Sequence, residues 1–244
     1  MKNYFTILFL ALCPIVATLM SSASVVSTPV SSIAATISMD SDEAFTSLVN
    51  ELRSSAKPED IKSVVTALEK ISQQGSTNWL VHYHTAYGYG RLAHSWPNTS
   101  DVDGWVDKGE TALAQARKCQ GADASELFTV EAYLNYARIR VNPMLRGYKY
   151  SKKGMELLNK SVDANQENPR AFLLVAQHFI NVPAFLGGDT EKACEYIAAT
   201  EKRLDAEAAN TDRNPLYPTW GRGESDQIAS FYCGANDESK KRDK

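Results

Sequence analysis

Histidines are the side chains of this sequence best suited to hold a metal ion or to move a proton. They stand at His82, His84, His94 and His178. His82 and His84 are two residues apart, so on a helix they point roughly 200° apart and cannot bind one metal ion together. His178 can meet one of them only across neighbouring helices, and no set of carboxylates stands at ligand spacing. The sequence therefore predicts no metal site and no cofactor.

Motifs for catalysis are missing as well. The sequence has no H-E-x-x-H and no G-x-S-x-G. Its acidic pairs have structural explanations, because Asp40 and Glu43 form a capping box at the start of the first predicted helix. Glu59 and Asp60 stand in a predicted first turn, where the helix dipole accounts for them. Cys194 fits a small buried residue on a packed helix. We therefore expect a protein that is not an enzyme.

A glycine pair, Gly187 and Gly188, stands just ahead of a helical pattern, where a phosphate-binding loop would also stand. The sequence favours a turn instead. The preceding helix must stop before Pro183, and a glycine after it accepts a positive φ without a Cβ clash. Asp189 can cap the following helix with its own carboxylate, which argues against a second anion. We expect a structural corner that packs Phe185 between helical units.

Another set of residues suits binding rather than catalysis. Aromatic and guanidinium side chains offer a large contact area at modest entropic cost, which is typical of recognition surfaces. For any one tyrosine, the alternative is that it packs between helices and exposes only its hydroxyl. The candidate ligand- or partner-binding residues are Tyr83, Tyr87, Tyr133, Tyr136, Arg138 and Arg140.

These residues lie in stretches with helical periodicity, of which about nine follow one another with almost no strand signal. Three of the stretches carry a small, a large and another small residue on one face, which lets a neighbouring helix approach closely. The pattern recurs at intervals of about forty residues, which is typical of a helical solenoid. The three sets are Gly109, Leu113 and Ala116; Gly154, Leu158 and Ser161; and Ala193, Ile197 and Thr200.

Each of these helices follows a longer, more aromatic helix, so the repeating unit is an antiparallel helix pair. We predict an all-α fold, a tetratricopeptide (TPR)-like right-handed helical solenoid of about four antiparallel pairs plus a C-terminal capping helix. The capping helix is expected over 224–233, where Ile228 and Phe231 would cover the open end. Trp220 follows an extended Pro-rich strap and is expected to share in the capping.

Four ordered blocks of the chain carry a resemblance to known proteins. The blocks are NWLVHYHTAYGYGRLA, SELFTVEAYLNYARIRVNPMLRG, ENPRAFLLVAQHFINVPAFLGGDTEKA and NPLYPTWGRGESDQIASFYC. They resemble an uncharacterised family of exported TPR-like proteins of Bacteroidetes, which implies a periplasmic or envelope location and no established activity. The helix–Gly-Gly–helix corner is also similar to one in the periplasmic TPR-like subunit of some tripartite solute transporters.

The two ends of the chain differ in composition from its helical middle. Lys2 and the apolar run after it predict a signal peptide cleaved near Ala23. The alternative is lipid anchoring at Cys13, which is disfavoured because Leu12 before it is too large for that signal. The predicted divisions are a signal peptide over 1–23, a flexible leader over 24–39, a TPR-like helical repeat domain over 40–233 and a disordered charged tail over 234–244.

Three cysteines remain after the predicted signal peptide, too few and too scattered for a disulfide framework. Export still permits one bridge, with one thiol left over. Our hypothesis is that Cys194 pairs with Cys233, which leaves Cys119 free.

Charge and hydropathy narrow the class of partner. The formal net charge is −3, and no Arg/Lys stripe alternates with aromatic residues, so nucleic acid is not expected as a partner. No second apolar run is long enough to predict a transmembrane segment after signal removal. We predict a non-catalytic exported scaffold that binds a protein or peptide in the bacterial periplasm or envelope. The alternative is a periplasmic small-solute-binding accessory subunit of a transport system, and fold-level analogy favours the scaffold.

Overall fold

The structure is a computed structural model that describes the backbone of residues 30–234 and the side chains of residues 42–234. The predicted signal peptide, Cys13 and the charged tail beyond residue 234 lie outside the described residues. The chain divides into two units, 1–39 and 40–244. The candidate sites discussed below lie in the second unit.

The first helix, α1 (Val30–Ser54), begins inside the segment for which the sequence predicts a flexible leader. The predicted capping box at Asp40 is therefore wrong, because the helix runs through this residue. Pro29 stands just before Val30, and the sequence has neither glycine nor proline from there to the end of the helix. With no residue that breaks a helix, the backbone continues as helix from Val30 to Ser54.

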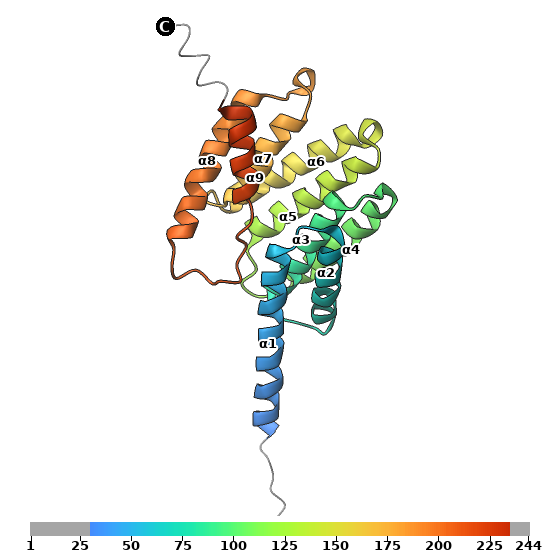
Figure 1. Cartoon of the computed structure of the whole chain (residues 1–244), viewed down its shortest axis with the longest axis vertical. Helices are drawn as coiled ribbons and strands as arrows, with labels where there is room; N and C mark the ends of the chain where they lie inside the picture. The colour runs from blue at the N-terminus through green and yellow to red at the C-terminus, as the bar shows by residue number, and fades with distance from the viewer. Residues whose placement is uncertain (1–29, 235–244) are drawn as a thin grey trace, which may run out of the picture. The chain divides into compact units, whose positions relative to one another are not determined.

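The described chain contains nine α-helices and no strand, in agreement with the predicted all-α class (Figure 1). Short 3₁₀ turns stand between some of the helices, and one turn of π-helix follows the last of them. The remaining helices are α2 (Pro58–Gln73), α3 (Trp79–Ser95), α4 (Val102–Ala116), α5 (Ala124–Ala137), α6 (Pro143–Ala164), α7 (Pro169–Asn181), α8 (Thr190–Ala209) and α9 (Arg222–Ile228).

Local sequence signals explain where most of these helices begin. A side-chain oxygen of the residue before α3, α5, α6, α7 and α8 accepts a hydrogen bond from a backbone N–H of the first turn, which satisfies a group the helix leaves unpaired. Proline occupies an early position in α2, α6 and α7, where its missing N–H costs nothing. The capping residues are Asn78, Asp123, Asn142, Asn168 and Asp189.

The helices pack as sequential antiparallel pairs, α3 with α4, α5 with α6, and α7 with α8. The predicted small-large-small pattern is confirmed, because all nine of its residues are buried. At Gly154 the ring of Tyr136 fills the place that a Cβ would occupy, and at Gly109 the side chain of Leu134 does so. The small residues therefore allow the close approach of neighbouring helices that the sequence predicts.

The first helices of the pairs, α3, α5 and α7, run parallel to one another. Near their N-terminal ends, the hydroxyl of Tyr83 donates to Glu126, and Arg170 donates to the same carboxylate. Near their C-terminal ends, His94 bonds to the Tyr133 carbonyl oxygen. The corner that leaves each of these helices must therefore lie at the same end of the unit, as Figure 1 shows for the α5–α6 and α7–α8 corners.

A segment over 210–221, here called the strap, connects α8 to α9 across α3, α5 and α7. Arg53 donates to the carbonyl oxygens of Pro215 and Tyr217, at 2.8 and 2.9 Å. His84 donates from Nε2 to the Leu216 carbonyl oxygen at 2.7 Å. Trp220 packs against all three hydrophobic clusters of the core. The predicted extended strap is thus part of the folded core.

A disulfide joins Cys194 on α8 to Cys233 just after α9, which confirms the hypothesis drawn from the sequence. Cys119 is free. Arg222, at the start of α9, pairs with Asp205 at 2.6 Å. These two links lie at opposite ends of α9 and make it antiparallel to α8, so its C-terminal end lies beside the start of α8.

Candidate functional site

Three of the predicted binding tyrosines, Tyr83, Tyr87 and Tyr133, lie beneath the strap and form what is here called the covered face. Tyr83 is fully buried, accepts a hydrogen bond from the Trp220 indole at 3.0 Å and donates to Glu126 at 2.9 Å. Tyr87 stacks on Trp220, with ring centroids 5.0 Å apart. Tyr133 lies 5.9 Å from the same indole. The chain's own strap therefore makes the contacts that a ligand would make here.

The two predicted arginines are engaged within the molecule. Arg138 forms ion pairs with Asp103, Asp107 and Glu110, at distances of 2.6 to 3.0 Å. Arg140 donates to two carbonyl oxygens at the C-terminal end of α3, including that of Trp96. Arg138 joins α4 to the end of α5, and Arg140 caps a helix. Their role in binding stays a prediction.

Tyr136, the remaining predicted residue, lies against a histidine that is open to solvent on one side. Its hydroxyl is 3.3 Å from Nδ1 of His178. His178 is partly exposed, and burial lowers its pKa below the ordinary value, so the ring is neutral at neutral pH. In the neutral tautomer with the proton on Nδ1, that N–H donates to Tyr136 and Nε2 keeps a lone pair for a ligand.

The other three histidines serve the core. His82 bonds through both ring nitrogens, to the Ser72 hydroxyl and the Ser76 carbonyl oxygen. Burial lowers the pKa of His84 and of His94 to about 4, and each ring donates to a backbone carbonyl oxygen. No group of three or more potential metal-ligating side chains occurs in the part of the chain that the structure describes. His178 is thus the histidine best placed to meet a ligand.

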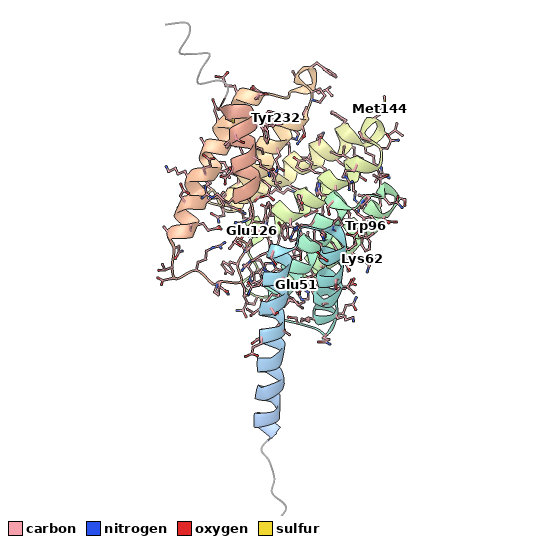
Figure 2. The ribbon with its side chains drawn as sticks, in the orientation of Figure 1. Glu51, Lys62, Trp96, Glu126, Met144 and Tyr232 are labelled. Carbon is pink, nitrogen blue, oxygen red and sulfur yellow. A yellow bond between two sulfur atoms is a disulfide. The ribbon has the colours of Figure 1, made fainter. Side chains whose placement is uncertain are left out.

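Large apolar side chains stand exposed at one end of the helical unit. Met144 is 96% exposed, Phe185 86% and Tyr148 80%. They come from the α5–α6 and α7–α8 corners and from the end of α9, which the helix directions bring to the same end; Figure 2 labels Met144 and Tyr232 there. We call this set the apolar edge, and its members are Met144, Leu145, Tyr148, Phe185, Leu186, Phe231 and Tyr232.

The apolar edge corrects two expectations. Phe185 does not pack between units, and Phe231 does not cover the open end, because both side chains are more than three-quarters exposed. Ile228 packs against the core as predicted, together with Ala229. The rest of the glycine corner is confirmed, since Gly187 has a φ of 101° and Asp189 accepts a hydrogen bond from the first turn of α8. The corner has the predicted backbone but presents its aromatic ring to solvent.

On α6, the apolar edge continues a partly buried apolar face of the helix out to solvent. Met144, Tyr148 and Met155 fall within about 40° of one another around α6, at 100° per residue. Met155 packs against the cluster that contains Leu174 and Val175 of α7. The face of α6 that carries Met155 therefore carries Tyr148 and then Met144 as it runs out past the packed region.

Lysine side chains border the strip that Met144, Tyr148 and Met155 form along α6. Lys152 lies about 60° around α6 from Met155, on the side of the strip away from the core. Lys152 and Lys153 are exposed and form no ion pair within residues 42–234. The strip therefore offers apolar contact beside cations, which suits a flat apolar ligand that bears anionic groups.

A separate cleft, of about 1140 Å³, lies over α3 between α2 and α4. Its walls are mainly hydroxyl, amide and charged side chains, with Thr85 and His82 on α3 and Cys119 after α4. Its lining contains no tyrosine, tryptophan or phenylalanine. The cleft therefore lacks the apolar surface that the edge provides.

The fold and the edge together describe an all-α protein of sequential antiparallel helix pairs with exposed apolar side chains at one end. The chain has the fold of the HusA haemophore from Porphyromonas gingivalis, with a TM-score of 0.70 and 28% sequence identity. The match covers 80% of this chain and 93% of that one. No family model matches the chain, and no curated protein does. The match is to a protein of a Bacteroidetes species, as the resemblance predicts, while membership of a TPR-like family is not confirmed by it.

Sequence reasoning missed the apolar edge. Its signal is present in the stretch PMLRGYKY, where methionine, leucine and tyrosine occupy the first turns of a helix whose core-facing positions begin later. The sequence indicates His178 only as a possible partner for other histidines. None of the helices in the described residues is both long and apolar enough to cross a membrane.

Proposed function

We propose that this protein is an exported haem-binding protein that holds the porphyrin on the apolar edge, between the α5–α6 and α7–α8 corners. The observation that carries the proposal is a neutral, partly exposed histidine in the last turn of α7, at the end of the unit that also carries the exposed apolar side chains, in a chain with the fold of a haemophore. Export follows from the predicted signal peptide.

The residues present fit the chemistry of haem. A porphyrin has two flat apolar faces, an iron that accepts an axial ligand, and carboxylate groups on one side. Tyr148, Met144 and Phe185 supply apolar surface, His178 supplies the axial nitrogen, and Lys152 supplies a cation for a carboxylate. Covering one large exposed side chain contributes about 1.5–3 kcal/mol, so several of them together favour binding strongly.

The pairing of Tyr136 with His178 suits a metal ligand. A histidine that binds iron through Nε2 usually donates its Nδ1–H to a second group, which fixes both the tautomer and the ring orientation. The Tyr136 hydroxyl, 3.3 Å from Nδ1, would accept this hydrogen bond in the tautomer that leaves Nε2 free for iron. Because burial lowers the pKa of His178, protons compete with iron for the ring only at acidic pH.

The test is a titration of the protein with haem and with iron-free protoporphyrin, followed by absorption spectroscopy. For His178→Ala we expect haem affinity to fall by about tenfold or more and the ligand-field bands to change. The same variant should bind iron-free protoporphyrin as the parent does. Tyr148→Ala should weaken both ligands, since it removes surface that contacts the macrocycle.

Phe231→Ala is the matched control, because Phe231 is similarly exposed but lies at the end of α9, beyond the two corners. It should leave both affinities unchanged. Equal haem affinity and identical spectra in the parent and in His178→Ala would contradict ligation by this residue. Loss of binding in Phe231→Ala alone would move the site to the other end of the edge.

Of the two functions that the sequence leaves open, we favour the small-solute binder, with a porphyrin as the solute. The TPR-like scaffold for a protein or peptide is the second candidate, because seven exposed apolar residues at one end also suit a protein partner. Binding of haem to the purified chain at one site, without displacement of a bound protein, would favour the porphyrin-binding function. A binding role also accords with the prediction that the chain is not an enzyme.

A further inference from the structure

A second, smaller pocket lies where the strap meets α1 and α3. It has a volume of about 240 Å³. At about 30 Å³ per water molecule this is room for a ligand of roughly eight heavy atoms, too little for a porphyrin. Its lining is Leu52, Arg53, His84, Tyr87, Arg91, Thr219, Trp220, Gly221, Arg222, Gly223 and Glu224. The pocket is therefore separate from the haem site proposed above, and the inference below does not depend on that proposal.

Two arginines give the pocket an excess of positive charge. Arg53 donates to two carbonyl oxygens of the strap. Arg91 donates to the carbonyl oxygens of Leu52 and Ser55, near the end of α1. Neither guanidinium forms an ion pair with a carboxylate in residues 42–234. Carbonyl oxygens carry no net charge, so these contacts orient the guanidinium groups without neutralising them.

The other charged groups of the lining do not cancel this excess. Arg222 is paired with Asp205. Glu224 is exposed at the rim and contributes one negative charge against the two of Arg53 and Arg91. His84 is neutral at neutral pH, because burial and then the nearby Arg53 hold its pKa at about 4. The pocket therefore keeps a net positive charge.

One wall of the pocket is aromatic. Tyr87 and Trp220 stack with their centroids 5.0 Å apart and an interplanar angle of 13°. The Arg91 guanidinium carbon lies 6.0 Å from the centre of the Tyr87 ring. A planar guanidinium beside aromatic rings is suited to an oxyanion attached to a flat apolar group, because the anion bonds the fork while the group packs on the rings.

We propose that this pocket binds a small organic anion, whose carboxylate or phosphate group lies between Arg53 and Arg91 and whose apolar part packs on Trp220. The two oxyanions share the same hydrogen-bonding chemistry with a guanidinium, and the experiment separates them. Since the strap forms part of the wall, the bound anion links α1, α3 and the strap.

The experiment is isothermal titration calorimetry of the whole folded chain with benzoate and with phenyl phosphate as probes. We expect one molecule of at least one probe to bind, and affinity to fall as salt is added. Arg91→Gln should lower the affinity by about tenfold or more, because it removes a charged donor. Benzoate binding alone identifies the natural group as a carboxylate, and phenyl phosphate binding alone identifies it as a phosphate.

Glu224→Gln keeps the test decisive even if Arg91→Gln folds poorly. Glu224 is exposed, so its replacement leaves the fold intact, and removal of its negative charge should raise the affinity by about threefold. Arg117→Gln is the control for charge alone, since Arg117 lies on a distant surface, paired with Glu131. Absence of binding of both probes at millimolar concentration would overturn the proposal. So would an affinity that Arg91→Gln and Glu224→Gln leave unchanged in folded protein.

Discussion

The covered face and the apolar edge contain the same kinds of side chain in opposite environments. On the covered face, Tyr83 is fully buried, and its hydroxyl both accepts from Trp220 and donates to Glu126. On the apolar edge, Tyr148 and Phe185 are at least 80% exposed. The difference shows that aromatic content alone does not locate a binding surface.

The two regions differ in whether another segment of the same chain packs against their aromatic side chains. The strap brings an indole and a row of carbonyl oxygens to the covered face, so the aromatic rings and polar groups there are satisfied. The corners that form the apolar edge have no such segment within the described residues. Exposed apolar surface of this kind is unfavourable in water unless a ligand or partner covers it.

The largest expected effect is a fall in the free energy of unfolding in acid, caused by His84 and His94. Burial lowers the pKa of His84 and His94 to about 4, against about 6.5 when unfolded. The unfolded chain therefore binds more protons between these values. The stabilisation is complete above about pH 6.5 and is lost as the pH falls toward 4, by about 3 kcal/mol for each histidine. Urea unfolding at pH 7 and pH 5 measures it, and equal free energies of unfolding at both would contradict it.

Removal of a buried charge beneath the strap should come next. Arg170 is 2% exposed and pairs with Glu126 and Glu207, both at 2.7 Å. Arg170→Ala leaves Glu126 buried without its cation, which we expect to lower the free energy of unfolding by about 3–5 kcal/mol. Urea unfolding at neutral pH checks this. Arg138→Ala is the control, because its acidic partners Asp103 and Asp107 are exposed enough to be hydrated, so a smaller loss is expected.

Reduction of the disulfide should lower the free energy of unfolding by a smaller amount. The disulfide lies at the boundary between the covered face and the apolar edge. Cys194 and Cys233 close a loop of 39 residues that includes the whole strap. Opening it should lower the free energy of unfolding by about 3 kcal/mol, because the unfolded chain regains freedom. Thermal unfolding of the Cys194→Ser/Cys233→Ser variant measures this, with Cys119→Ser as a control. An unchanged unfolding temperature would show that packing alone fixes the strap.

Much of the helical framework can be predicted from the sequence, because periodicity and capping act locally. The buried pattern at Gly109, Leu113 and Ala116 and the cap at Asp189 follow from residue type and spacing. The start of α1 could not be predicted, since a charge-free segment rich in Ser, Thr, Val and Ala with no helix breaker is compatible with either a leader or a helix. The disulfide could be proposed only as a hypothesis, because spacing does not determine connectivity.

The candidate site depends on long-range packing that local patterns do not encode. Tyr83 and Tyr148 are both tyrosines on predicted helices, and only the path of the strap decides which of them is covered. Arg138 could be recognised as a charged side chain, but its three acidic partners come from α4. The exposure of Phe185 depends on the absence of a neighbour at its corner, and a sequence pattern does not reveal that.

The smallest expected effect on stability belongs to the apolar edge, and it tests the comparison most directly. Phe185→Ser should change the free energy of unfolding by no more than about 0.5 kcal/mol, since the ring makes few contacts at 86% exposure. Tyr87→Ser, the matched change on the covered face, should cost about 3 kcal/mol because it leaves a cavity beside Trp220. Haem affinity should respond in the opposite order, falling in Phe185→Ser and persisting in folded Tyr87→Ser. Urea unfolding and haem titration of the two variants measure both quantities. If Phe185→Ser were the more destabilising change, the ring would be a packing residue and the edge would not be a free surface.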